Sequence, residues 1–171
     1  VVCTNPPYMG GSGMSTRLAD YVKNNYPDSK SDMSTVFMEK TINMCKTNGY
    51  MAMINIPVWM FLSSYEKLRE KLFSLNTLSS MVHLGRGVFG SDFGTTSFIF
   101  TKHISGGFKG SYRRLFEKQG AVDSVETKEK WFFEGKGSFN ANQADFSKIP
   151  GMPVAYWVSK AVYLSLIHIS E

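Results

Sequence analysis

The first ten residues of the chain constrain its fold more than any other stretch. Val1-Val2-Cys3 is a short apolar run, typical of the end of a buried strand, and it leads directly into Asn5-Pro6-Pro7-Tyr8. Two consecutive prolines fix two φ angles at about −65° and remove two backbone donors. Because the residue before each proline is held extended, helix and sheet pairing both stop here. The sequence therefore predicts a rigid ledge beyond the carboxyl end of a strand, where ligands bind in open α/β sheets.

The chemistry of this ledge suits the binding of a planar amine. The Asn5 side-chain carbonyl and the Pro6 backbone carbonyl are two acceptors that can take both hydrogens of one amino group. Such a pair draws the nitrogen towards tetrahedral geometry and turns its lone pair towards an electrophile. Tyr8 supplies an aromatic face on which a base can stack, an interaction of about 1–3 kcal/mol per base. The alternative is a proline-rich turn with an incidental tyrosine.

The string Asn5-Pro6-Pro7-Tyr8 resembles the amine-binding motif of the amino-group DNA methyltransferases, in the form typical of adenine-specific enzymes. Three further segments, residues 26–32 (YPDSKSD), 59–64 (WMFLSS) and 146–151 (FSKIPG), resemble the PglX family. These are the large adenine-specific DNA methyltransferases of the BREX phage-defence systems, and the similarity covers most of residues 1 to about 160. The resemblance implies S-adenosylmethionine as methyl donor and the adenine 6-amino group of double-stranded DNA as acceptor. It also implies other phage-defence proteins as candidate partners.

The resemblance implies an α/β fold as well. The expected architecture is the carboxyl half of a Rossmann-like class I methyltransferase sheet, with an antiparallel last strand. The donor-binding first half, with its glycine-rich turn, is expected upstream of this chain, so the cofactor-binding residues are left unassigned. By the same resemblance, the catalytic role falls to all four residues of Asn5-Pro6-Pro7-Tyr8.

The apolar pattern up to residue 104 predicts helix followed by parallel strand, half of a doubly wound unit. Residues 9–33 are polar and predict a long loop with one short helical turn at residues 17–23. A helix at about residues 34–47, capped by Ser31 or Asp32, precedes a buried strand at residues 50–56. Two further strands, residues 77–84 and 96–102, are expected to form the antiparallel end of the sheet.

The helix between these strands, at about residues 65–73, is predicted to begin with a capping box formed by Ser63 and Glu66. It buries Leu68 and Leu72 and exposes a solvated charged face, which consists of Glu66, Lys67, Arg69, Glu70 and Lys71. Several other residues are interpreted as core rather than as ligands, namely Cys3, Cys45, Trp59, Met60, Phe61 and His83.

The loop at residues 85–96 holds four glycines, two aromatic residues and an acid between two strands. In the adenine family an aromatic residue in this loop stacks on the extruded base, opposite the tyrosine of the motif. Phe89 matches that role best by position, and Phe93 is second. The alternative is a hairpin loop whose aromatic residues are simply buried, and the sequence leaves both open.

The basic residues are the candidates for contact with DNA. The net charge is +5 and the pI about 9.2, which fits a polyanionic partner but also serves solubility. Lys30, Lys109, Arg113 and Arg114 are the candidate DNA contacts, since basic residues interleaved with aromatic ones can touch nucleic acid. Solvated lysines and short β segments of a linking region explain them equally well.

Three regions are expected along the chain. Residues 1–104 are the carboxyl half of the catalytic domain, and residues 105–163 are a linker leading into a target-recognition region. Residues 164–171 do not continue the family pattern and look like translated adapter sequence, so they are excluded from functional reasoning.

Composition excludes several classes of protein. Cys3 and Cys45 are the only cysteines and form no C-x-x-C pair, which argues against a disulfide framework or a zinc site, so no metal is expected. The apolar stretches are too short to span a bilayer, and no signal peptide is visible. The cytoplasm is therefore the expected location, with no membrane partner.

The leading hypothesis is a fragment of a site-specific, adenine-specific DNA methyltransferase that acts in phage defence. Without its donor-binding half, the isolated chain is expected to be inactive. A second hypothesis is methylation of a protein glutamine side chain, because enzymes of that kind share the same four-residue motif. A third is a non-catalytic remnant that binds DNA.

Overall fold

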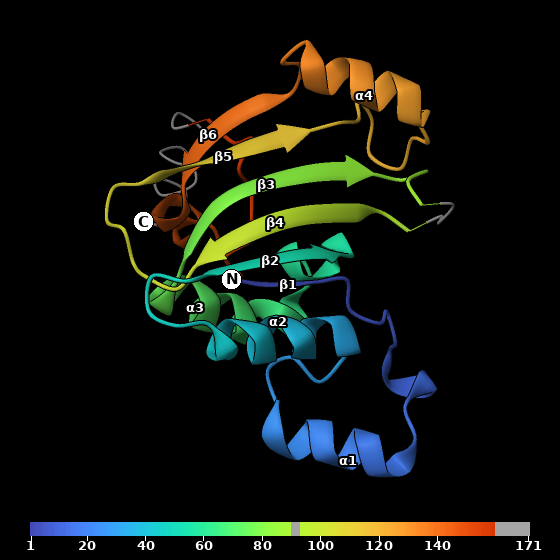
Figure 1. Cartoon of the computed structure of the whole chain (residues 1–171), viewed down its shortest axis with the longest axis vertical. Helices are drawn as coiled ribbons and strands as arrows, with labels where there is room; N and C mark the ends of the chain where they lie inside the picture. The colour runs from blue at the N-terminus through green and yellow to red at the C-terminus, as the bar shows by residue number, and fades with distance from the viewer. Residues whose placement is uncertain (90–92, 160–171) are drawn as a thin grey trace.

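A computed structural model describes residues 1–89 and 93–159, and six strands within these residues form one mixed sheet (Figure 1). The strands are β1 (Val2–Thr4), β2 (Tyr50–Asn55), β3 (Thr77–Gly85), β4 (Thr95–Thr101), β5 (Lys109–Arg114) and β6 (Ser138–Asn142). Their order across the sheet is β1-β2-β4-β3-β5-β6. The strands predicted at residues 50–56, 77–84 and 96–102 are confirmed to within one residue at each end.

The directions of the strands create one shared edge. β1 is parallel to β2 and β3 is parallel to β5, whereas β4 is antiparallel to both β2 and β3. The carboxyl ends of β1, β2, β3 and β5 therefore lie at the same side of the sheet, which we call the carboxyl edge. The chain leaves this edge at Asn5, Ile56, Arg86 and Leu115. The antiparallel β4 confirms the predicted hairpin and returns the chain from the carboxyl edge.

Two helices cover one face of the sheet, α2 (Met33–Met44) and α3 (Glu66–Leu75), as Figure 1 shows. Asp32 caps α2, because its Oδ1 accepts a hydrogen bond of 2.8 Å from the Ser34 amide. The core between these helices and the sheet is rich in sulfur and aromatic side chains, among them Met38, Met51 and Phe98. Such side chains fill irregular gaps well, and this packing fixes the sheet that carries the carboxyl edge.

The helical turn predicted at residues 17–23 is confirmed in position but is longer than predicted, because the segment at residues 9–33 contains a ten-residue helix, α1 (Thr16–Asn25). Ser15 caps it, with Oγ accepting from the Leu18 amide at 3.4 Å. Figure 1 shows α1 standing away from the sheet, beyond α2. We call residues 10–32, which include α1, the α1 arm. The base of this arm is closed, because Met33 N donates to Met9 O at 2.9 Å and Gly10 pairs with Asp32 in an antiparallel bridge.

The prediction that Arg69 belongs to a solvated face is also wrong. Its side chain is fully buried, and its guanidinium donates to the carbonyl oxygens of Trp59, Leu62 and Gly151 at 2.7, 2.8 and 2.6 Å. Helical spacing places Arg69 three residues before Leu72, on the side of α3 that faces the protein. The fork of the guanidinium reaches carbonyls in separate segments that a shorter polar side chain would not reach together.

The predicted capping box of this helix is wrong as well. Ser63 lies in a 3-10 turn, Ser63–Tyr65, and Tyr65 takes the N-cap position of α3 without a side-chain hydrogen bond to the helix. The turn holds the helix start by packing, because Tyr65 is buried in the core. The start of α3 therefore depends on burial rather than on the Ser63 hydroxyl.

Most of the other core predictions are confirmed. Trp59, Met60, His83 and Cys45 are all buried, whereas Phe61 keeps 36% of its surface exposed. Cys3 is exposed, contrary to the prediction, because β1 is the edge strand and pairs on one side only among the described residues.

Residues 105–159 add β5, β6 and the helix α4 (Val125–Phe133) to the same sheet. A 3-10 segment, Gln143–Lys148, follows β6 and places Phe146 in the core. The functional division of the chain at residue 104 stays a prediction. The predicted read-through segment at residues 164–171 lies outside the described residues.

Candidate active site at the carboxyl edge

The proline ledge begins where β1 ends, and one of its four residues is buried while the other three are exposed. Thr4 pairs with Met53 of β2, so the strand keeps its register up to the residue before Asn5. Pro6 is buried, whereas Asn5, Pro7 and Tyr8 are exposed. The buried proline anchors the ledge against the sheet, while Asn5 and the Tyr8 ring, 45% exposed, are accessible to solvent.

A hydrogen bond joins the two polar side chains of the ledge. The Tyr8 hydroxyl donates to Asn5 Oδ1 at 2.8 Å and lies 3.3 Å from the Ile54 carbonyl oxygen at the end of β2. One hydroxyl hydrogen serves mainly the shorter contact, so the bond fixes which end of the carboxamide is the oxygen. Burial raises the pKa of Tyr8, which keeps the phenol protonated and able to donate.

This bond has a consequence for amine binding. The Asn5 oxygen has two lone pairs, so one remains for a ligand when Tyr8 occupies the other. Sequence reasoning treated Tyr8 as a stacking surface only and missed its hold on Asn5. No signal in the sequence indicates this contact, because extended backbone before each proline does not by itself bring residues three positions apart together.

Phe89 and Phe93 flank the part of the loop that the structure does not describe, residues 90–92. Both side chains are largely exposed, at 70% and 71%. Phe89 has a φ of 58°, in the left-handed region that non-glycine residues rarely adopt, and such strain is typical of functional loops. Within the described residues no ring contact joins Phe89 to Tyr8, so a shared clamp on a base stays a prediction.

Two of the four basic candidates are exposed, and the other two, Arg113 and Arg114, are half-buried. Lys30 and Lys109 are exposed. Arg113 donates to the carbonyl oxygens of Trp131 and Phe132 at 3.1 and 2.5 Å, at the carboxyl end of α4. A cation at that end of a helix is stabilised by the helix dipole, which gives Arg113 a structural role. Contact of these residues with DNA stays a prediction.

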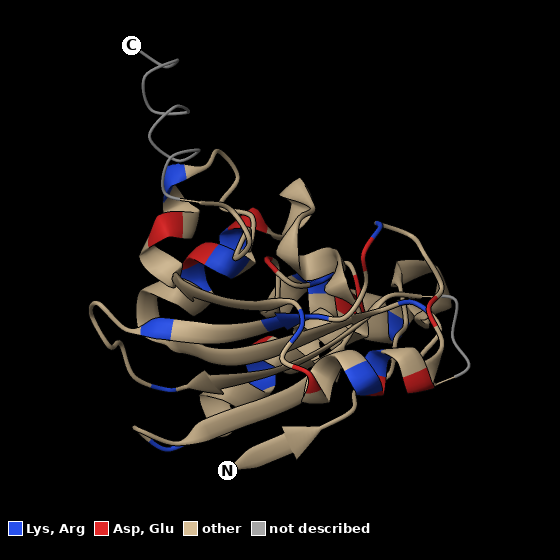
Figure 2. Cartoon of the chain, turned by 90° about the horizontal axis from the view of Figure 1, so that it is seen from above, with Lys and Arg blue, Asp and Glu red and all other residues tan. Residues whose placement is uncertain are grey.

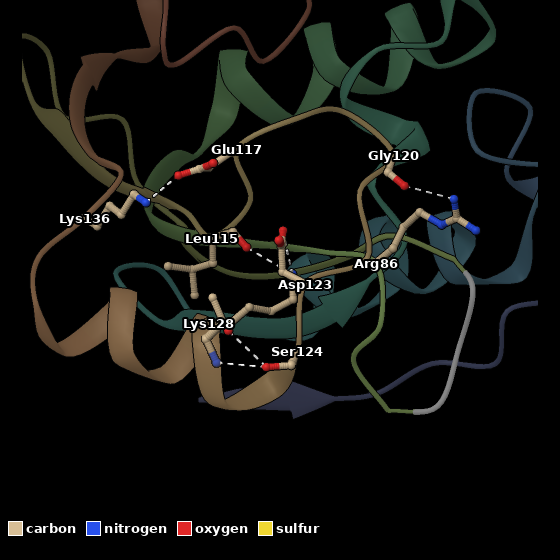
Figure 3. Close-up of polar contacts among 9 residues, drawn as sticks. Arg86, Leu115, Glu117, Gly120, Asp123, Ser124, Lys128 and Lys136 are labelled. Carbon is tan, nitrogen blue, oxygen red and sulfur yellow. Dashed lines mark hydrogen bonds and ion pairs between the residues drawn. The ribbon is translucent and has the colours of Figure 1, made fainter.

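The loop after β5 forms a wall of the carboxyl edge and is held by side-chain contacts from three sides (Figure 3). Arg86 donates to the Gly120 carbonyl at 3.1 Å, and Lys136 donates to Glu117 at 2.6 Å. Lys128 is buried and donates to the Leu115 carbonyl at 3.0 Å, and this burial lowers its pKa. These contacts fix residues 115–124 against β3 and α4.

Charge and metal chemistry add little to the site. Figure 2 shows Lys and Arg dispersed among Asp and Glu, without one basic face in that view. Over residues 1–89 and 93–159, no group of three His, Cys, Asp or Glu side chains is arranged to hold a metal ion. Over the same residues, no helix combines the length and the apolar character that crossing a membrane requires.

The strand order and the ledge after β1 define a class of protein, and solved restriction-modification methyltransferases share this fold. One is a nuclease-deletion mutant of the type ISP restriction-modification enzyme LlaGI, in complex with a DNA substrate mimic. Its TM-score is 0.60 at 17% identity, over 88% of this chain and 17% of that one. The predicted fold class, a class I methyltransferase sheet, is confirmed.

The sequence profile of the Eco57I restriction-modification methylase family matches residues 1–89, and the chain belongs to this family. Among curated relatives, the adenine-specific methyltransferase BrxX of Escherichia coli O9:H4 (strain HS) is 40% identical over 97% of this chain. The adenine-specific methyltransferase PglX of Lacticaseibacillus casei (strain Zhang) is 42% identical over 92% of it. The chain spans 14% of the length of each of these relatives.

Proposed function

We propose that this chain forms the amine-binding part of the catalytic domain of a site-specific DNA adenine methyltransferase. The parent enzyme would transfer a methyl group from S-adenosylmethionine to the 6-amino group of an adenine. The observation that carries the proposal is the exposed Asn5 carboxamide, oriented by Tyr8 on a ledge at the carboxyl edge. The family and the adenine-specific relatives support the same reaction.

The residues of the ledge act by orientation. Asn5 Oδ1 and the Pro6 carbonyl would accept the two hydrogens of the adenine amine and so direct its lone pair outward. Tyr8 would stack on the ring while its hydroxyl keeps Asn5 in place, and Phe89, with Phe93 second, would cover the opposite face. Holding reactants in line in this way supplies much of a rate enhancement without a strong general base.

S-adenosylmethionine supplies an activated methyl group on a sulfonium, a good leaving group. The chain fits the acceptor side of this reaction, because Asn5 is exposed directly beyond the carboxyl end of β1. The residues that would bind the donor itself are not assigned to this chain. The chain's own residues would position the amine. They would also disfavour amines without an aromatic ring, because Tyr8 needs a ring on which to stack.

DNA is the proposed partner, and the extruded adenine is the group that reaches the ledge. The solved relative with a DNA substrate mimic supports this choice. Lys30, Lys109, Arg113 and Arg114 are the proposed contacts to DNA, and a role in phage defence, together with other proteins of such a system, follows the BrxX and PglX relatives. A location in the cytoplasm belongs to the same proposal.

The test is Asn5→Ala in the full-length parent, with Asn43→Ala on the exposed surface of α2 as the matched control. Loss of one oriented hydrogen bond in the transition state costs about 10²- to 10³-fold in kcat. We expect that loss for Asn5→Ala, with DNA affinity within roughly threefold because phosphate contacts dominate it. Full methylation by Asn5→Ala would overturn the proposal.

The same experiment separates the two alternatives. Methylation of a protein glutamine amide by the parent, without methylation of DNA, would favour the glutamine hypothesis. Loss of DNA binding in a parent that never methylates would favour a DNA-binding remnant. The isolated 171-residue chain, given labelled donor and DNA, is expected to transfer no methyl group.

A further inference from the structure

A second pocket lies at the carboxyl edge, and its walls are aromatic. The cavity has a volume of about 210 Å³ and is bounded by six residues, Phe61, His83, Arg114, Phe116, Gln119 and Trp157. An adjoining cavity of about 170 Å³ shares His83, Phe116 and Gln119 with it and extends to Pro57 and Gly85. The first of these, which we call the aromatic pocket, has no role in the amine-binding ledge.

The place of the pocket in the sheet separates it from the ledge but keeps both at one edge. Asn5 follows β1, whereas His83 lies near the carboxyl end of β3, with β2 and β4 between them. Neighbouring strands are about 4.8 Å apart, so the two sites are about 14 Å apart across the sheet. One DNA molecule that runs along the carboxyl edge can reach both.

The walls present flat surfaces at different angles. Ring centroids are 5.8 Å apart for Phe61 and Trp157 and 4.7 Å apart for His83 and Phe116, which meet edge to face. Phe61 and Trp157 remain 36% and 39% exposed, so the cavity opens to solvent on their side. A planar heterocycle can stack on such walls, and every base offers a suitable face.

The polar groups of the pocket suit the edge of a base. The Arg114 guanidinium lies 5.8 and 5.4 Å from the ring centroids of Phe116 and Phe139. Among the described residues the guanidinium contacts these two rings and no acceptor takes a hydrogen bond from it, so its donors remain available to a ligand. Gln119 is exposed and brings one amide with both a donor and an acceptor.

His83 adds a neutral ring to this set. Its Nδ1 lies 3.1 Å from the Tyr156 hydroxyl, which fixes the orientation of the imidazole. Burial, aided by the positive charges of Arg114 and Lys128, lowers the pKa of His83 to about 4. The ring is therefore uncharged at neutral pH and stacks or hydrogen-bonds without repelling Arg114.

We propose that the aromatic pocket binds a single nucleobase. The pocket has stacking walls, the volume of about one base, and donors and acceptors at its rim. Together these features can recognise a purine or pyrimidine ring. The base comes either from a DNA strand along the carboxyl edge or from a free nucleotide. The first source rests on the proposed function, whereas the second does not. A fatty or aliphatic ligand would leave Arg114 and Gln119 unused.

The test uses the 171-residue chain in a Trp131→Phe background, in which Trp157 is the partly exposed tryptophan and Trp59 is buried. The probes are short single-stranded oligonucleotides, the same oligonucleotides with abasic sites, and nucleoside monophosphates. Quenching of Trp157 fluorescence reports a base in the pocket. Binding of oligonucleotides with bases but not of abasic ones identifies a DNA base, and binding of monophosphates identifies a free nucleotide.

Two pocket variants and one control variant decide the outcome. Phe61→Leu and Arg114→Gln should each weaken binding by about tenfold, the scale of one stacking or charged contact. Phe133→Leu, a 78% exposed ring outside the aromatic pocket, should bind as the unsubstituted chain does. Far-UV circular dichroism checks that each variant is folded.

The proposal is overturned if no probe quenches Trp157 or if both pocket variants bind like the control. It is also overturned if binding is lost in Asn5→Ala and kept in the pocket variants, since the base would then occupy the ledge. Methylation by the parent depends on Asn5 and is measured separately. An empty aromatic pocket would therefore leave the proposed function untouched, and an inactive ledge would leave the pocket result intact.

Discussion

Replacement of Arg69 by methionine is the most direct test of how this fold is held together. Arg69 is fully buried in α3 and donates to three carbonyl oxygens, those of Trp59, Leu62 and Gly151. These carbonyls belong to two segments distant in sequence, the turn that follows β2 and the segment that follows the 3-10 helix Gln143–Lys148. Arg69→Met keeps the apolar stem but leaves all three acceptors without this donor.

The expected loss of stability in Arg69→Met follows from the number of hydrogen bonds that are removed. A hydrogen bond from a charged group contributes about 1.5–3 kcal/mol, and a buried carbonyl left unpaired costs about 1–3 kcal/mol. Methionine avoids the cost of desolvating a buried guanidinium, so the net loss is smaller than three full bonds. We expect Arg69→Met to lower the free energy of unfolding by about 3–5 kcal/mol, a large part of the 5–15 kcal/mol typical of a domain.

Urea unfolding, followed by far-UV circular dichroism, measures this loss. Lys67→Met is the matched control, because Lys67 is exposed on the same helix and its replacement should cost less than about 0.5 kcal/mol. Arg69→Lys should fall between the two, since one ammonium cannot reproduce the planar fork. If Arg69→Met is within about 1 kcal/mol of Lys67→Met, the three carbonyl contacts do not stabilise the fold and this account of Arg69 fails.

Two further predictions concern the ledge and His83. Tyr8→Phe in the full-length parent keeps the ring but removes the donor to Asn5, so kcat should fall about tenfold with DNA affinity unchanged; an unaltered methylation rate would contradict this. The pKa of His83 is about 4 in the folded state and 6.5 ordinarily, so protonation of this ring favours unfolding. The fold therefore has its full stability above pH 6.5 and loses stability as the pH falls from 6.5 to 4. The unsubstituted chain should lose about 3 kcal/mol more than His83→Gln over this range in urea unfolding, and parallel profiles would refute it.

The central strands of the fold were predictable because their sequences leave little choice. Residues 50–56 are almost continuously apolar and stop at Pro57, a pattern that predicts a strand covered on both faces, whereas in β2 only one face, that of Met51, Met53 and Asn55, is buried. The hairpin of β3 and β4 followed from two apolar segments joined by a glycine-rich loop. Asp32 was one of two predicted caps for α2, and its hydrogen bond to Ser34 selects it.

The errors fall where tertiary contacts override local pattern. Arg69 looked exposed because five charged residues share its helix, and the three carbonyls that pair with it come from elsewhere in the chain. α1 looked like a loop because its composition is polar, and few of its side chains are buried apart from Val22. Such a helix depends on its Ser15 cap and on its closed base, which hydrophobic periodicity does not reveal.

The candidate site was predicted more completely than its internal contacts. The position of Asn5 and Tyr8 at the end of a strand followed from two prolines after an apolar run. The hydrogen bond between their side chains needed coordinates. The aromatic pocket was not predicted at all, because Phe61, His83 and Trp157 come from three separate parts of the sequence.

The closed base of the α1 arm gives this fold a natural point for variation. Because Met33 N bonds to Met9 O directly after Tyr8, the backbone path at Asn5 and Tyr8 is set before the arm begins. The largely exposed residues 11–21 can be lengthened, shortened or exchanged at little thermodynamic penalty, whereas Ser29 and Asp32 are needed because they bond to Glu39 and cap α2. The outer part of the arm can therefore vary, in nature or by engineering, while the backbone of the proline ledge beside it stays as it is.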